Sequence, residues 1–207
     1  MIVGFVGFIG SGKGTAGDIL CDKYNFVKES FAKPVKDIAS VMFGWDRKML
    51  EGDTSESREW REKRDVLWTT LLEKDFSPRL ALQLIGTEVG RNVFHSDLWI
   101  KMMESRLTPS IKNYVITDVR FPNEMKFIHN MGGKIIEIRR GKMPEWYGIA
   151  AAANMDDTYS EKEMHDKYKI HDSEWRWIGS TYIDTVIRNN DGVVELEKNV
   201  SDYLTLA

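Results

Sequence analysis

The segment Gly7-Phe8-Ile9-Gly10-Ser11-Gly12-Lys13-Gly14-Thr15, close to the N-terminus, constrains this chain more than any other feature. An apolar run at residues 2–6 precedes it and predicts a short buried strand, and residues 15–24 after it predict a helix. Glycine adopts backbone conformations closed to other residues, so the segment can curl until successive N–H groups point inward. The following helix adds the positive end of its dipole. This order of strand, glycine loop and helix predicts a site that holds phosphate groups.

Two polar side chains of this loop carry the expected chemistry. Lys13 is expected to reach the terminal phosphates of a nucleotide and to offset charge that develops during transfer, and the Thr15 hydroxyl is expected to join a magnesium shell. Gly14 separates the two, and this ending resembles the nucleoside monophosphate kinases more than GTPases or motor ATPases. The alternative is a glycine turn that binds nothing.

Composition limits the remaining possibilities. The chain has 207 residues, which suits one domain or one domain with insertions, and its formal net charge of −3 argues against a bulk nucleic-acid coat or a polybasic membrane anchor. Its single cysteine, Cys21, excludes an intrachain disulfide framework and a multi-cysteine zinc site. No apolar run approaches about 18 residues, and the first residues do not resemble a signal peptide. We therefore expect a cytoplasmic protein with neither a nucleic-acid nor a membrane partner.

Beyond the loop, short apolar runs alternate with stretches of helical periodicity. Further strands are expected at residues 26–29, 114–117, 134–138 and 185–187. Further helices are expected from Pro34, from Pro78, and at residues 97–107, 123–130 and 194–204. Strands separated by helices predict an α/β domain with a mainly parallel sheet.

Two segments interrupt this alternation, within what we expect to be a single domain over residues 1–207. Residues 46–75 are rich in charge, and their larger apolar residues predict a stripe on one face of a helix: Trp60, Leu67, Trp68, Leu71 and Leu72. The segment is either a solvated amphipathic helix or a helical substrate-domain insertion. Residues 143–178 have no clean period, and we interpret them as a lid or loop insertion.

A kinase must also hold an acceptor, and phosphate-rich sites need several cations. Asp118 and Arg120 follow the strand at residues 114–117, and Arg139 ends the next strand. All three residues are therefore expected at the carboxyl edge, where open α/β sheets bind ligands. Asp118 is a candidate for binding magnesium or orienting the acceptor, Arg120 for bridging phosphates, and Arg139 for acting as a catalytic cation of the lid. The alternative for each is a purely structural ion pair.

Three further cations are candidates for the acceptor side. Arg79 directly follows Pro78 at the start of a helix, where its planar fork could clamp an acceptor phosphate. Lys33 and Lys36 flank Pro34 and could border the acceptor nucleoside. Solvated surface side chains are the alternative for all three. The four histidines show no metal-ligand spacing.

Taken together, these motifs resemble the bacteriophage-type deoxynucleoside monophosphate kinases. Besides the glycine loop, the match covers residues 31–37, 79–88, 97–99 and 115–120, the strand ending in Arg139, and residues 187–192, in order and at similar spacing. The resemblance implies the three-layer sandwich of a P-loop kinase, with a mainly parallel sheet and with helical substrate-binding and lid insertions. It implies ATP-dependent transfer of a phosphoryl group to a deoxynucleoside monophosphate, with Mg²⁺, and it allows a homodimer.

The resemblance also assigns residues. It implies that the loop segment Gly10, Ser11, Gly12, Lys13, Gly14 and Thr15 holds ATP, with Asn189 near the adenine. It implies that the acceptor lies among Lys33, Arg79, Trp99, Asp118, Arg120 and Glu124. Two alternatives stay open: another small-molecule kinase of this kind, such as a dephospho-coenzyme A kinase, and a nucleotide-dependent binding or switch protein.

Overall fold

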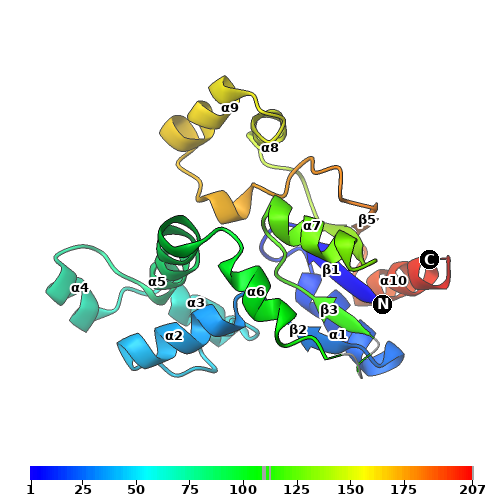
Figure 1. The fold of residues 1–207 in the computed structure, drawn as a ribbon, viewed down its shortest axis with the longest axis horizontal. Helices are drawn as coiled ribbons and strands as arrows, with labels where there is room; N and C mark the ends of the chain where they lie inside the picture. The colour runs from blue at the N-terminus through cyan, green and yellow to red at the C-terminus, as the bar shows by residue number, and fades with distance from the viewer. Residues whose placement is uncertain (109–110, 112, 207) are drawn as a thin grey trace. The chain divides into compact units, whose positions relative to one another are not determined.

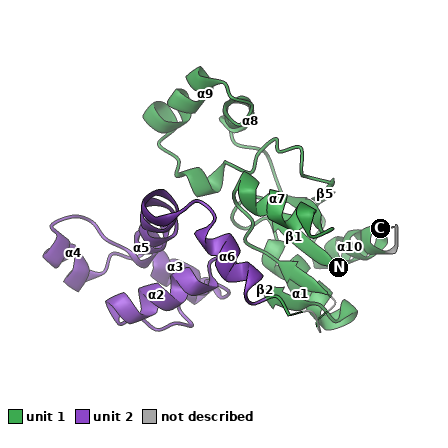
Figure 2. Cartoon of the chain, in the orientation of Figure 1, with its two compact units in different colours: residues 1–30, 107–207 green, residues 31–106 purple. Residues whose placement is uncertain are grey.

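The computed structural model describes residues 1–108, 111 and 113–206. The chain divides into two compact units, shown in Figure 2: unit 1 comprises Met1–Ser30 and Leu107–Ala207, and unit 2 comprises Phe31–Arg106. Within the described ranges, none of the helices combines the length and the apolar character that crossing a bilayer requires.

A five-stranded sheet forms the centre of unit 1 (Figure 1). Its strands are β1 (Ile2–Val6), β2 (Val27–Glu29), β3 (Tyr114–Ile116), β4 (Lys134–Arg139) and β5 (Thr185–Arg188). They run in the order β2-β3-β1-β4-β5, and every pairing is parallel. The parallel α/β class expected from the sequence is therefore confirmed. The segments that follow β1, β3 and β4 all begin at the same carboxyl edge.

Helices cover both faces of this sheet. They are α1 (Lys13–Tyr24), α7 (Pro122–Asn130) and α10 (Val193–Leu206). Val3 and Phe5 of β1 are fully buried in a core that includes Leu20 of α1 and Leu196 of α10. Successive strand residues face opposite sides of a sheet, and the intervening Gly4 lies against Ile128 of α7. The result is three layers, with α1 and α10 on one face and α7 on the other (Figure 1).

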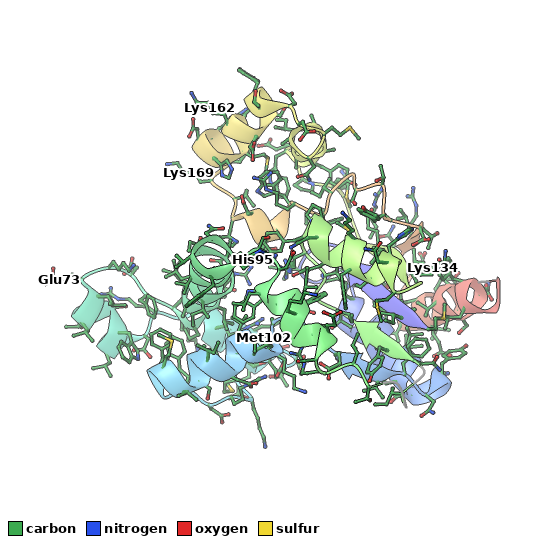
Figure 3. All side chains as sticks on the ribbon, in the orientation of Figure 1. Glu73, His95, Met102, Lys134, Lys162 and Lys169 are labelled. Carbon is green, nitrogen blue, oxygen red and sulfur yellow. The ribbon has the colours of Figure 1, made fainter. Side chains whose placement is uncertain are left out.

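Residues 143–178 are more regular than a loop. They form helical pieces: α8 (Tyr147–Ala153), α9 (Thr158–Glu163), the π-helix η2 (Met164–Tyr168) and the 3₁₀-helix η3 (Asp172–Glu174). Trp175 and Trp177 are almost fully buried at the base of this insertion, and Lys162 and Lys169 are exposed on its outer surface (Figure 3). The sequence lacks a clean period here because each helical piece is short and the buried tryptophans, Trp175 and Trp177, follow the last piece.

Unit 2 is helical. It contains α2 (Lys33–Phe43), α3 (Ser55–Glu62), α4 (Val66–Leu72), α5 (Pro78–Gln83), the π-helix η1 (Leu84–Phe94) and α6 (Leu98–Glu104). Asp65 ends the connection between α3 and α4 and caps α4, because its carboxylate accepts a bond from the Trp68 backbone N–H at 3.0 Å.

This break makes the predicted single stripe at residues 46–75 wrong. Leu67 and Leu71 are 69% and 66% exposed, so they do not share a buried face with Trp60. The aromatic residues instead gather around Phe43, which stacks on Trp45 with ring centroids 4.5 Å apart and meets Trp68 edge-on at 5.0 Å. The stripe assumed one continuous helix, whereas Asp65 caps a second, separate helix.

Candidate functional site

The glycine loop joins β1 to α1 at the carboxyl edge of the sheet. Gly7 has φ 139° and Gly12 has φ 106°, both in the region that L-residues rarely adopt. Gly12 is also the N-cap of α1, and no side chain of the described residues caps that helix end. The first turn carries no acidic residue. The backbone N–H groups at the start of α1 and the positive end of the helix dipole are therefore suited to binding an anion.

Lys13 lies inside the curl of this loop. Its Nζ donates to the backbone oxygens of Gly7 at 2.7 Å and of Phe8 at 2.8 Å. Burial is the largest effect on Lys13, and together with the positive charge of Arg120 it lowers the pKa to about 7, against the opposite effects of Glu174 and Asp118. These four groups therefore form one electrostatic cluster, in which a phosphate would supply the missing negative charge.

The lowered pKa of Lys13 gives a testable dependence of stability on pH. The folded chain releases this proton near pH 7, whereas an unfolded lysine holds it to about pH 10.4. Between these values the unfolded state binds more protons, so Lys13 makes the free energy of unfolding rise with pH, by at most about 1.4 kcal/mol per pH unit. Urea unfolding at pH 7.5, 8.5 and 9.5 measures this slope.

The variant Lys13→Met isolates the contribution of this residue, because methionine has similar length and does not titrate. We expect the slope of the wild type to exceed that of the variant throughout this window. Equal slopes would show that the Lys13 ammonium keeps its ordinary pKa in the folded chain.

Asp118 and Arg120 follow β3 beside the loop. The Asp118 carboxylate accepts a hydrogen bond from the Ser30 hydroxyl at 2.7 Å. The backbone N–H of Arg120 donates to the Glu124 carboxylate at 2.7 Å, and Glu124 also accepts from the Phe121 N–H at 3.1 Å. Glu124 is 2% exposed. It therefore shapes the turn that carries Arg120, and nothing in its surroundings tests the predicted contact with an acceptor.

Sequence reasoning missed Glu174, which is the partner of Arg120. Its carboxylate lies 2.9 Å from Arg120 Nη1, which also donates to the Ser173 backbone oxygen at 3.1 Å. A single acidic residue within an irregular segment gives no sequence signal. The pairing exists because the fold brings η3 back to the carboxyl end of β3.

Arg139 ends β4 as predicted, but its guanidinium is already engaged. Nε and Nη2 bind the two oxygens of Glu137 at 2.7 and 2.8 Å, and Nη2 also bonds Tyr147 Oη at 3.0 Å. Glu137 is 3% exposed, and a buried carboxylate is costly unless a cation pairs with it, so the Arg139 guanidinium stabilises Glu137. The structural alternative given above for Arg139 therefore has direct support, while a role as a catalytic cation stays a prediction.

An aromatic cluster fixes the base of segment 143–178 to the loop. Phe8 of the loop meets Trp177 edge-on at 5.1 Å, Trp146 at 5.6 Å and Tyr147 at 6.2 Å. Edge-to-face pairs of this kind add stability beyond the area they bury. The base of this segment is thus part of the wall that supports the glycine loop.

Asn189 follows β5 and reaches the glycine loop. Its side-chain amide Nδ2 donates to the Ser11 backbone oxygen at 2.8 Å, and the residue is 7% exposed. Asn189 therefore lies close to the loop, and its side-chain amide is used within the protein. A contact between this turn and an adenine ring stays a prediction.

The remaining predicted residues belong to unit 2. Lys36 pairs with Glu51, and Arg79 lies 3.5 Å from Glu62. Lys33 opens α2 and is exposed. Trp99 is 4% exposed, and its indole N–H donates to the Gly86 oxygen at 2.7 Å. Trp99 is thus held in the core of unit 2, and its predicted contact with an acceptor has no support there.

The loop fits the phosphates of a nucleotide, and two observations support this. The Ser11 hydroxyl is buried without a hydrogen-bond partner in the described part of the chain, and the Lys13 ammonium faces backbone oxygens of the curl. No cluster of three or more His, Cys, Asp or Glu able to hold a metal occurs among the described residues. Magnesium fits as an ion that enters with the nucleotide, since it commonly takes one or two protein oxygens plus substrate phosphates.

The site and the fold together define a parallel α/β protein with a phosphate-binding loop. The family model for deoxynucleotide monophosphate kinases matches residues 49–147. A protein of Acanthamoeba polyphaga mimivirus, described as a deoxynucleotide monophosphate kinase, is 32% identical over 179 residues, covering 79% of this chain and 82% of the relative. The deoxynucleoside-5'-monophosphate kinase of Escherichia phage T5 is 31% identical over 174 residues, covering 60% and 70%. The chain belongs to the deoxynucleotide monophosphate kinase family.

Solved structures also align with the chain. Shikimate kinase from Aquifex aeolicus is 13% identical with a TM-score of 0.45, covering 99% of this chain and 96% of its own. Dephospho-CoA kinase from Campylobacter jejuni is 14% identical with a TM-score of 0.37, covering 99% and 96%.

Proposed function

We propose that this chain transfers the terminal phosphoryl group of ATP directly to a deoxynucleoside monophosphate, giving ADP and the deoxynucleoside diphosphate. The observation that carries the proposal is the cluster of Lys13, Arg120, Asp118 and Glu174 at the carboxyl edge of the sheet. It sets the phosphate loop beside a second cation, as transfer between two phosphates requires. Membership of the family supplies the class of acceptor.

On the donor side, the loop from Gly10 to Thr15 binds the phosphates of ATP. Backbone N–H groups at the start of α1 hold the phosphate oxygens, and Lys13 exchanges its two carbonyl partners for them. Lys13 then offsets charge that accumulates on the transferred group. The Thr15 hydroxyl and the Asp118 carboxylate would hold Mg²⁺, which would neutralise charge on the donor phosphates.

On the acceptor side, Arg120 binds the phosphate that receives the new group. Its Nη1 now faces the Glu174 carboxylate at 2.9 Å, so an acceptor phosphate would replace one anion by another. Asp118 orients the acceptor, and Arg79 of unit 2 supplies a further cation. Lys33, Lys36, Trp99 and Glu124 complete the proposed acceptor set, and Arg139 is the proposed cation of segment 143–178.

The transfer proceeds in line and without a phosphoenzyme. The attacking acceptor oxygen forms a bond to the γ-phosphorus of ATP as the bond from that phosphorus to the β–γ bridging oxygen breaks. The leaving oxygen departs with ADP. Segment 143–178 contributes by excluding water, which otherwise competes as the acceptor.

ADP release with a panel of acceptors tests the proposal. The panel contains the four common deoxynucleoside monophosphates, the matching ribonucleotides, dephospho-coenzyme A and a sample without acceptor. We expect ADP release to depend on at least one deoxynucleoside monophosphate, with formation of its diphosphate. Turnover of dephospho-coenzyme A alone would assign a different kinase activity. Slow ADP release that no acceptor accelerates would favour a nucleotide-dependent switch.

A further inference from the structure

Asn189 is held through both its backbone and its side chain. Its backbone N–H donates to the Arg139 oxygen at 2.8 Å, which fixes the residue at the end of the sheet. Its Nδ2 donates to the Ser11 oxygen at 2.8 Å, across 178 positions of sequence. Asn189 is 7% exposed and Ser11 is 3% exposed, so losing this bond would leave the buried Ser11 carbonyl oxygen without this partner.

This bond fixes the orientation of one peptide group in the glycine loop. In a trans peptide the C=O and the next N–H point in opposite directions, and the described chain contains no cis peptide. Asn189 draws the Ser11 oxygen toward the end of β5. The Gly12 N–H, in the same peptide plane, must therefore point away from Asn189.

The approach of Asn189 also requires glycine at position 12. A Cβ on Gly12 would lie 2.3 Å from Asn189 Nδ2, far inside contact distance. Gly12 has φ 106°, which an L-residue rarely adopts. The glycine and the distant asparagine therefore act as a pair: the first leaves space for the second, and the second sets the peptide plane between Ser11 and Gly12.

We propose that Asn189 is a positioning residue for the donor, which orients the Gly12 N–H toward a phosphate of the bound nucleotide. The proposal rests on the proposed function, in that the loop binds nucleotide phosphates. It differs from a contact with adenine, because Asn189 acts here through the Ser11 carbonyl and needs no base. Its consequence is that Asn189 matters equally for any polyphosphate that enters the loop.

The test uses the full chain with Asn189→Asp and Asn189→Ala. Aspartate has the shape of asparagine, but it places a carboxylate oxygen, which cannot donate a hydrogen bond, next to the Ser11 oxygen. Alanine removes the hydrogen bond without introducing this repulsion. The matched control is Ser160→Ala, which removes a hydrogen bond of 2.6 Å from the partly buried Ser160 hydroxyl to Asp157 at the start of α9. Thermal unfolding of all variants verifies that they fold.

The first readout is the ¹⁵N–¹H resonance of Gly12 in the nucleotide-free protein, observed with ¹⁵N-glycine labelling. We expect it to move in both Asn189 variants and to stay in place in the control. This measurement does not depend on catalysis, so it remains informative if the proposed reaction is wrong. An unchanged Gly12 resonance in the alanine variant would overturn the proposal, even if the aspartate variant failed to fold.

The second readout compares ATP with inorganic tripolyphosphate as ligands. If Asn189 orients the loop, both should bind about tenfold more weakly or worse to Asn189→Ala, with the KM of the acceptor nearly unchanged. Weakening of ATP alone would identify an adenine contact and overturn the positioning role. A wild type that binds neither ligand would refute the proposed function, while the Gly12 resonance would still report the orientation of the peptide.

Discussion

Replacing Lys13 with alanine is expected to lower kcat by about 100-fold or more. The ammonium lies within the curl of the loop, where its two bonds to backbone oxygens hold it until a phosphate arrives. A cation preorganised in this way stabilises charge in the transition state, and losing one such group raises the barrier by about 3 kcal/mol or more. Initial rates of ADP release at saturating ATP and acceptor measure the effect.

Folding has to be separated from catalysis in this experiment. Lys13→Met keeps most of the side-chain volume, and we expect it to unfold at or above the temperature of the wild type near pH 7, because it removes a charge that burial disfavours. Its kcat should fall as far as that of the alanine variant. A rate within a few fold of the wild type in both variants would refute the catalytic assignment of Lys13.

The largest effect on stability is expected from Gly7→Ala. A Cβ at this position would lie 2.4 Å from the backbone oxygen of Ile138 in β4, and the φ of 139° is unfavourable for alanine. The obstacle is a strand backbone, which cannot move aside as a flexible side chain can. Backbone strain and overpacking each cost roughly 1–3 kcal/mol, so we expect the free energy of unfolding to fall by about 3 kcal/mol or more.

Gly148→Ala is the matched control for that measurement. Gly148 lies in α8, and nothing lies within 4 Å of a Cβ built there. Alanine favours a helix by about 1 kcal/mol over glycine, so this variant should be unchanged or slightly more stable. Urea unfolding of the two variants gives the comparison. A Gly7→Ala variant as stable as Gly148→Ala would mean that Gly7 does not approach the Ile138 backbone of β4 as described.

Much of the fold could be predicted from local patterns. The five strands and the helices that flank them lie within a few residues of their expected bounds, because apolar runs and glycine or proline boundaries are local signals. Helix α1 starts at Lys13 rather than Thr15, as the loop runs directly into its first turn. The helices at 55–62 and 66–72 were harder to predict, since Asp65 caps a new helix inside an apparently continuous pattern.

The candidate site divides in the same way. Lys13, Asp118 and Arg120 follow strands of a parallel sheet, and this alone predicts that they meet at one edge. Their partners could not be predicted: Glu174 for Arg120 and Ser30 for Asp118 come from segments distant in sequence, and neither lies in a recognisable motif.

The sequence by itself determined the phosphate loop and the parallel α/β class, because both follow from the local conformational freedom of glycine and the periodicity of apolar residues. Tertiary structure decided how the polar groups are used. It placed the Asn189 amide on the Ser11 oxygen, the Arg139 guanidinium on Glu137 and the Trp99 ring in the core of unit 2. A polar side chain binds whichever partner the folded backbone brings within about 3 Å, and that distance depends on the whole chain.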